Sequence, residues 1–194
     1  MSGTSRRRSV FEGAILDVGV ETVVLPNGCE IDLEIARHRG GSAAVAIDDD
    51  GRVCLLRQYR HAAGGWLWEI PAGKREPEEG AEETARRELA DEAGVEAGRW
   101  TSLGDVLSSP AVLTEVIHLY LARELRSVPA RHEPSEVLEV HWLPLAEALE
   151  RAGRNDIRDA KTLVGLYRAA QLLSSEAPTK RRKGTRDAHP RARG

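Results

Sequence analysis

Two glutamates are spaced so that they could hold a metal ion. Glu88 and Glu92 lie four positions apart in a segment whose apolar residues recur at helical spacing, with Asp91 beside them. Like charges at this spacing destabilise an isolated helix by roughly 0.2–0.5 kcal/mol. Carboxylate oxygens on one helical face suit the hard cations Mg²⁺ and Mn²⁺. The pattern therefore indicates a divalent-cation site, and the alternative is a solvated, salt-bridged surface helix.

The residues around this helix favour the cation site. A strand expected at 66–70 runs through the turn Pro71-Ala72-Gly73 and a charged loop into a helix expected at 79–93. Residues 73–95 read GKREPEEGAEETARRELADEAGV. This segment resembles the Nudix box, G-x5-E-x7-R-E-U-x-E-E-x-G-U, where U is a bulky aliphatic residue. The matching positions are Gly73, Glu79, Arg87, Glu88, Leu89, Glu92, Gly94 and Val95, whereas Asp91 stands where the family has glutamate.

The Nudix resemblance implies a fold, a reaction and a cofactor. The implied fold is α/β (α+β), with a mixed β-sheet sandwiched between helices and an N-terminal antiparallel β segment. The implied reaction is metal-dependent hydrolysis of a nucleoside diphosphate linked to another moiety, with Mg²⁺ or Mn²⁺ as the ion. The implied metal ligands are Glu88, Glu92 and the carbonyl of Ala72, and Glu92 also counts as catalytic. The residues implied to brace the box are Gly73, Glu79, Arg87, Asp91 and Gly94.

The resemblance extends beyond the box to the ADP-ribose pyrophosphatases. Residues 57–60 (RQYR), residues 68–73 (WEIPAG) and a proline 15 positions after Val95 are similar to markers of that subfamily, although Ala111 stands where glycine is common. The implied reaction is ADP-ribose to AMP and ribose 5-phosphate. The expected substrate-binding residues are Arg57, Arg60, Glu69, Arg37 and Pro110. Guanidinium groups suit phosphate oxygens, whereas Glu69 either accepts a ribose hydroxyl bond, supports a metal or forms an internal salt bridge.

A catalytic base is expected after the box. Hydrolysis needs a carboxylate that takes a proton from the attacking water, and in this subfamily the base tends to lie on a later loop. The connection 124–135 carries Glu133, and Glu136 follows just before the strand expected at 137–143. We predict Glu136 as the base with Glu133 as the second choice; alternatively, both are solvated loop charges.

The remaining elements place this unit in a mixed sheet. Strands are expected at 14–18, 21–25, 42–47, 52–58, 102–107 and 116–122, and helices at 145–152 and 160–174. The turn Asp48–Gly51 predicts a hairpin between its two flanking strands. We assign residues 1–9 to a disordered N-terminus, 10–40 to an N-terminal β segment, 41–175 to the Nudix domain and 176–194 to a disordered basic tail.

Composition limits the other functions that the chain could have. The 194 residues carry a formal charge of −3, while the segment 179–194 holds seven basic residues against one aspartate, so the body is acidic and suits a polyanion poorly. We therefore expect no nucleic-acid partner. Two cysteines without a CxxC pair, no long apolar run and no signal-like apolar segment predict a cytoplasmic protein outside the membrane.

Three alternatives remain open from the sequence. The first is a Nudix hydrolase of another nucleoside diphosphate compound, such as ADP-glucose, GDP-mannose or a dinucleotide. The second is a Nudix module that binds ADP-ribose without cleaving it. The third is a nucleic-acid-associated protein that acts through the basic tail. The resemblance also implies a homodimer in which the N-terminal strands, with Arg37, reach the partner's site.

Overall fold

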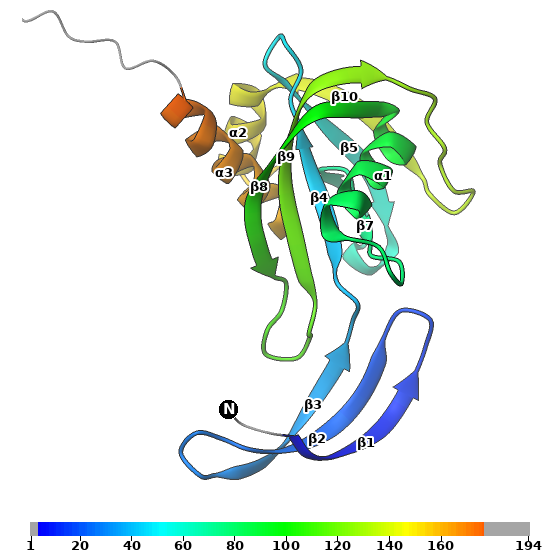
Figure 1. Ribbon diagram of the computed structural model, residues 1–194, viewed down its shortest axis with the longest axis vertical. Helices are drawn as coiled ribbons and strands as arrows, with labels where there is room; N and C mark the ends of the chain where they lie inside the picture. Colours follow the sequence, from blue (N-terminus) through cyan, green and yellow to red (C-terminus); the bar gives the residue numbers. More distant parts are fainter. Residues whose placement is uncertain (1–3, 177–194) are drawn as a thin grey trace, which may run out of the picture.

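The computed structural model describes residues 4–176, which form three β-sheets and three α-helices (Figure 1). The N-terminal sheet is antiparallel, in the order β1 (Thr4–Glu12), β2 (Asp17–Val24) and β3 (Glu30–Arg37). In Figure 1 it lies at one end of the molecule, beyond the rest of the fold. It joins the body through β3, where Ala36 donates to the carbonyl of Val112 at 2.8 Å.

The prediction that residues 1–9 are disordered is wrong for residues 4–9, which form most of β1. The basic run finds acidic partners on β2, because Arg7 lies 2.6 Å from Asp17 and 3.4 Å from Glu21. The strand expected at 14–18 is also misplaced, since Gly13 donates to the carbonyl of Leu16 in the turn that precedes β2. Residues 1–3 lie outside the described residues, as does the predicted basic tail except for Glu176, which ends a helix.

The body contains two further sheets. The first is mixed, in the order β7 (Ala72–Lys74), β4 (Gly41–Ala46), β9 (Val116–Ser127) and β8 (Val95–Leu107), with β4 parallel to β9. The second is antiparallel, in the order β10 (Leu138–Pro144), β5 (Arg52–Arg60) and β6 (Gly65–Glu69). A short 3₁₀ helix, His61–Ala63, joins β5 to β6.

The predicted hairpin between β4 and β5 is wrong beyond its turn. Gly51 donates to the carbonyl of Asp48 at 3.0 Å, so the turn forms, but only Ile47 and Val53 then pair across it. The two strands diverge into different sheets because both edges of β4 are taken, by β7 and by β9. A strand that is paired on both edges has no free backbone N–H and C=O groups with which to pair the next strand in sequence.

The helices cover both faces of the mixed sheet. α1 (Ala81–Ala93) packs on one face and α3 (Ala160–Glu176) on the other (Figure 1), while α2 (Leu145–Gly153) packs against α3 and against β5 and β10 of the antiparallel sheet. All of β4 is buried, which explains why it reads as a continuous run of small and apolar residues rather than an alternating one. The predicted mixed sheet between helices is confirmed. None of the described helices has the length and apolarity needed to cross a bilayer.

Candidate active site

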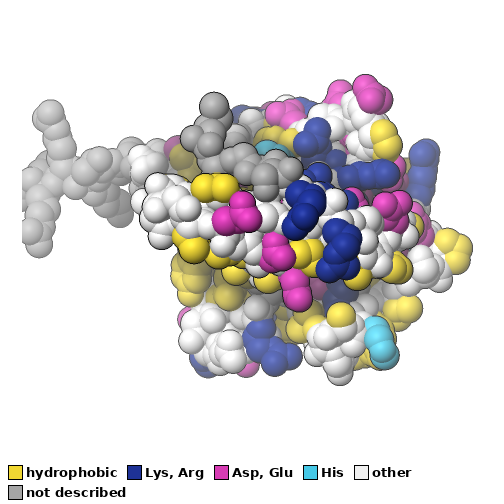
Figure 2. Space-filling view, turned by 90° about the horizontal axis from the view of Figure 1, so that it is seen from below, with side chains coloured by type: hydrophobic (Ala, Val, Ile, Leu, Met, Phe, Trp, Pro, Cys, Tyr) yellow, Lys and Arg dark blue, Asp and Glu magenta, His cyan; other side chains and the backbone are white. Residues whose placement is uncertain are grey.

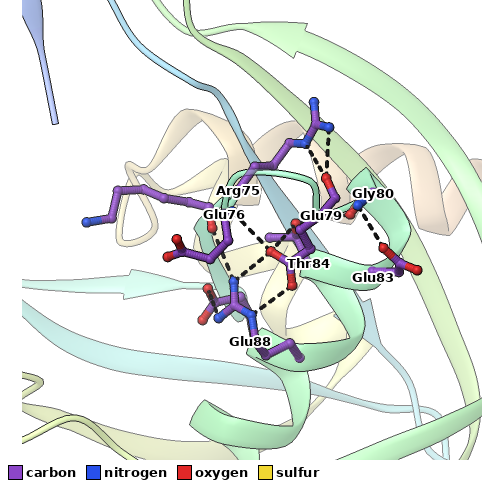
Figure 3. Close-up of polar contacts among 9 residues, drawn as sticks. Arg75, Glu76, Glu79, Gly80, Glu83, Thr84 and Glu88 are labelled. Atoms are coloured by element: carbon purple, nitrogen blue, oxygen red, sulfur yellow. Dashed lines mark hydrogen bonds and ion pairs between the residues drawn. The ribbon is translucent and has the colours of Figure 1, made fainter.

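A partly buried ionic cluster holds the loop before α1 against the helix (Figure 3). The carboxylate of Glu79 accepts two hydrogen bonds from Arg87, at 2.9 and 3.0 Å, and one from the hydroxyl of Thr84 at 2.8 Å. The bonds from Arg87, against the opposing effect of burial, lower the pKa of Glu79 to about 2. Arg75 donates to the Glu79 carbonyl at 2.9 Å. Glu79 and Arg87 thus occupy the bracing position that the box resemblance implies.

Arg87 also fixes the first of the two acidic residues. Its third guanidinium nitrogen, Nη1, donates to a carboxylate oxygen of Glu88 at 2.7 Å. The same carboxylate lies directly on Gly73, where a Cβ atom would come within 1.9 Å of it. A side chain at position 73 would therefore displace the carboxylate of Glu88 from this position.

Glu92 is held one helical turn further along, with 2% of its surface exposed. Its carboxylate accepts the backbone N–H of Ala72 at 2.8 Å. Burial raises the pKa of Glu92 to about 8; the Ala72 bond opposes this shift, and the charges of Glu88 and Glu136 add to it. Burial also raises the pKa of Glu88, against the opposing charge of Arg87.

These residues fit a divalent cation. Two neighbouring buried carboxylates with raised pKa values are groups that a positive charge would stabilise. The donors are oxygens, which suit Mg²⁺ or Mn²⁺. Within residues 4–176 no three His, Cys, Asp or Glu side chains are gathered as a complete ion cage. The residues therefore fit an ion that takes its remaining ligands from water and substrate, as Mg²⁺ commonly does.

The two glutamates open into a cleft of about 980 Å³. Asp91, on the same helix, lines the cleft, as do Glu133 and Glu136 from the connection between β9 and β10. Cationic side chains of Arg60 and Lys161 also line it. The volume is that of a site for a small organic ligand, and the mixed charges suit an anionic ligand accompanied by a cation.

The cationic side chains are organised by Glu69, which is 2% exposed. Arg60 donates to its two carboxylate oxygens at 2.8 and 3.0 Å, and Lys161 donates at 2.6 Å. Burial alone would raise the pKa of Glu69, but Arg60 and Lys161 together lower it to about 2. Of the three roles considered for Glu69, the structure shows the internal salt bridge, which it forms with Arg60 and Lys161. Lys161 is absent from the predicted site because it lies on α3, 92 positions after Glu69, with no motif to mark it.

Of the five predicted substrate-binding residues, Arg60 lines the cleft of this chain, whereas Glu69, Arg57, Arg37 and Pro110 do not. Arg57 faces away from it, 3.6 Å from Glu139 and over the ring of Trp66. Arg37 lies in the N-terminal sheet, 2.7 Å from Glu21, and Pro110 is exposed in the β8–β9 connection. Of the predicted binding residues, the structure brings Arg60 and Glu69 together.

Comparisons with known proteins agree with this architecture. The NUDIX domain model matches residues 37–164. The ADP-ribose pyrophosphatase of Bacillus subtilis is 36% identical over 161 residues, covering 82% of this chain and 87% of that one. The enzyme of the same name from Mycobacterium tuberculosis is 35% identical over 166 residues, covering 84% and 80%. A GDP-mannose pyrophosphatase of Cronobacter sakazakii is 33% identical over 150 residues, covering 69% and 78%.

A solved structure, described as an ADP compounds hydrolase, shares the fold. It superposes with a TM-score of 0.79 at 20% identity, covering 91% of this chain and 96% of the other. The chain belongs to the Nudix family. It is a Nudix pyrophosphohydrolase of the ADP-ribose pyrophosphatase type, which confirms the family predicted from the box and the type predicted from the markers outside it. Enzymes of this family generally use divalent metal ions.

Proposed function

We propose that this protein hydrolyses ADP-ribose to AMP and ribose 5-phosphate, with Mg²⁺ or Mn²⁺ held by Glu88, Glu92 and the carbonyl of Ala72. The observation that carries the proposal is the joint presence, in one cleft of about 980 Å³, of the buried carboxylates of Glu88 and Glu92 and of the cationic side chains of Arg60 and Lys161. Glu69 accepts hydrogen bonds from both cationic side chains. A diphosphate needs both a cation and guanidinium or ammonium donors to offset its charge. The relatives named ADP-ribose pyrophosphatase support the choice of substrate.

Each residue has a part in the proposed reaction. Arg60 binds a phosphate oxygen while Glu69 holds its guanidinium in place. The carboxylate of Glu136 takes a proton from the attacking water as the new oxygen–phosphorus bond forms. The bridging phosphorus–oxygen bond breaks, and the second phosphate leaves as a monoester. When bound, the divalent cation offsets the diphosphate charge and lowers the pKa of the attacking water.

The assignment of the base predicts different effects at the two loop glutamates. Glu136→Gln removes the proton acceptor and is expected to lower kcat by roughly 100-fold or more. Glu133→Gln is expected to stay within about threefold of the parent, because Glu133 is exposed and contributes a backbone N–H to Glu136. Steady-state hydrolysis of ADP-ribose with Mg²⁺ measures both. The reverse ranking would transfer the role of base to Glu133.

The substrate is tested by a panel of diphosphate compounds. The protein is incubated with Mg²⁺ or Mn²⁺ and one of four substrates: ADP-ribose, ADP-glucose, GDP-mannose or a dinucleotide. An added phosphatase converts the phosphate monoesters that form into inorganic phosphate, which is then measured. The highest kcat/KM is expected for ADP-ribose, and EDTA is expected to abolish turnover. A preference for GDP-mannose would favour the activity of the relative from Cronobacter sakazakii. Binding of ADP-ribose without monoester release would favour the non-catalytic alternative.

We infer in addition that the protein forms a homodimer through its N-terminal sheet. The sheet lies beyond the body (Figure 1), and strands β1 to β3 have exposed apolar residues that include Val10 and Phe11. In such a dimer Arg37, which does not line its own cleft, could approach the cleft of the partner. A partner sheet would supply the second layer that an isolated sheet of this size lacks.

A further inference from the structure

The connection between β9 and β10, residues 128–137, is bound to the end of the helix that carries the two glutamates. Val128 donates its backbone N–H to the carbonyl of Gly94 at 2.9 Å, and Arg131 donates to the carbonyl of Asp91 at 2.9 Å. The last carbonyls of a helix have no partner within the helix, so they are free to accept such bonds. The connection therefore takes its position from α1.

A side chain adds a third bond to the same end of α1. A ring nitrogen of His132, Nε2, lies 2.8 Å from the carbonyl oxygen of Glu92. A carbonyl can only accept, so the imidazole donates. The bond reaches the backbone of Glu92 while its side chain lies in the cleft, so His132 ties the connection to the residue at the centre of the proposed site.

Gly94 permits this close approach. It ends α1 in the left-handed conformation, with a φ of +65°, which favours glycine. A Cβ atom at Gly94 would lie 3.1 Å from the carbonyl oxygen of Val128 and 3.4 Å from Ala130. Gly94, the last glycine of the box, therefore has two roles: it ends α1, and it lets the connection approach because it has no side chain in the way.

The residues after His132 form a closed turn that holds Glu136. Glu133 donates its N–H to a carboxylate oxygen of Glu136 at 3.0 Å, and Glu136 donates its N–H to the Glu133 carbonyl at 2.9 Å. The connection is bound again at its far end, where Tyr59 donates to the carbonyl of Val137 at 2.9 Å. His132 is the last bond to α1 before this turn, so its position helps to set where the Glu136 carboxylate stands.

We propose that His132 is a positioning residue, which by its bond to the Glu92 carbonyl holds Glu136 over the glutamates of α1. The inference rests on the proposed role of Glu136 as the base. His132 does not touch substrate in this proposal; it restricts the turn that carries the base. A small displacement of a catalytic group is enough to slow a reaction, because the productive geometry tolerates little error.

The first test removes the bond and then restores it. His132→Ala is expected to lower kcat for ADP-ribose roughly tenfold, with KM within about twofold and an unchanged melting temperature. His132→Gln, whose amide can reach the same carbonyl, is expected to recover kcat to within about threefold of the parent. Hydrogen exchange of peptides covering 130–140 should be faster in His132→Ala alone. Normal kcat in His132→Ala, or no recovery in His132→Gln, would overturn the proposal.

A double-mutant cycle separates this proposal from the assignment of the base. If His132 acts through Glu136, adding His132→Ala to Glu136→Gln should lower kcat by less than about twofold further. A full tenfold loss in that background would show that His132 acts elsewhere and would overturn the proposal. Normal turnover in Glu136→Gln alone would instead refute the base and the positioning role together. If the parent cleaves GDP-mannose rather than ADP-ribose, only the substrate assignment fails, and the cycle is run on GDP-mannose.

Discussion

Glu92 accepts hydrogen bonds from residues that are distant from it in sequence. Its carboxylate receives the N–H of Ala72, 20 positions earlier, and its backbone carbonyl receives the imidazole of His132, 40 positions later. Both contacts are made at the C-terminal end of α1, which Gly94 caps two residues after Glu92. One residue thus joins the turn before the box, the acidic helix and the connection that carries the proposed base.

Replacing Glu92 tests the acidic site with little change of shape. Glu92→Gln keeps the side-chain volume and an acceptor for the Ala72 N–H, so the melting temperature is expected to stay within a few degrees of the parent. Turnover with Mg²⁺ is expected to fall by roughly 100-fold or more, because an amide is a poorer ligand for a hard cation.

A matched control lies on the same helix. Glu82 pairs with Arg86 at 2.7 Å and is about half exposed, outside the cleft. Glu82→Gln removes one charge from α1 and is expected to leave turnover unchanged and to cost at most about 0.5 kcal/mol. Near-normal turnover in Glu92→Gln, or an equal loss in Glu82→Gln, would contradict the site.

What could be predicted at this scale came from local spacing and from the resemblance to the Nudix box. Helical spacing alone placed Glu88 and Glu92 side by side on α1, whereas the bracing roles of Glu79 and Arg87 were implied by the resemblance. Lys161 and His132 reach the site through folds of the chain that no local pattern encodes. Arg57 shows the opposite error, because it lies near a real binding residue, Arg60, yet its side chain turns to Glu139.

At the scale of elements, an ion triad joins three pieces of the fold. Glu69 ends β6, Arg60 ends β5 and Lys161 lies in the first turn of α3. The bonds hold the end of one sheet to a helix that packs on the other sheet. Removing one partner of a buried ion pair leaves the other charge without compensation, and the cost is larger than the value of the pair itself.

Glu69→Gln is therefore expected to destabilise the protein by roughly 3 kcal/mol at pH 7. That corresponds to a fall in melting temperature of roughly 6–12 °C for a chain of this size. The folded pKa of about 2 lies below the ordinary value of 4.5, so this stabilisation is present above that ordinary value and is lost as the pH falls toward 2. The difference between parent and variant should shrink between about pH 5 and 2.

Thermal melts at several pH values measure this difference, with Glu139→Gln as the control. Glu139 pairs with Arg57 at 3.6 Å on the neighbouring strand β10, and half of its side chain is exposed. An exposed pair of this kind contributes at most about 1 kcal/mol. A gap between parent and Glu69→Gln that stays constant down to pH 2 would contradict the assigned charge state.

The elements also show where prediction from sequence fails. The acidic helix and the two C-terminal helices lie close to their predicted positions, because each has its own periodicity. The separation of β4 from β5 was not predictable from their turn, since it depends on β9, some 70 residues later, pairing with β4. Likewise, the sequence of β1 alone resembles a disordered basic segment, because the acidic partners of Arg7, Asp17 and Glu21, lie on β2.

At the scale of the whole molecule, no second layer packs on the N-terminal sheet within residues 4–176. The sheet is three-stranded and joins the body mainly at the end of β3. Seen from the end of the molecule that carries it, hydrophobic side chains lie between basic and acidic ones (Figure 2). Val10, Phe11 and Ile15 each expose more than half of their surface. Large exposed apolar side chains on a sheet with an open face are consistent with a protein interface there.

The dimer predicted from this surface can be weakened at one residue. We expect sedimentation velocity to give twice the mass of one chain, and Phe11→Ser to raise the dimer dissociation constant by roughly tenfold or more, because it removes a large apolar side chain from the interface. Tyr167→Ser is the control, since Tyr167 is 50% exposed on α3, against 58% for Phe11 on β1. A monomer at every concentration, or equal weakening by both substitutions, would place the interface elsewhere or remove it.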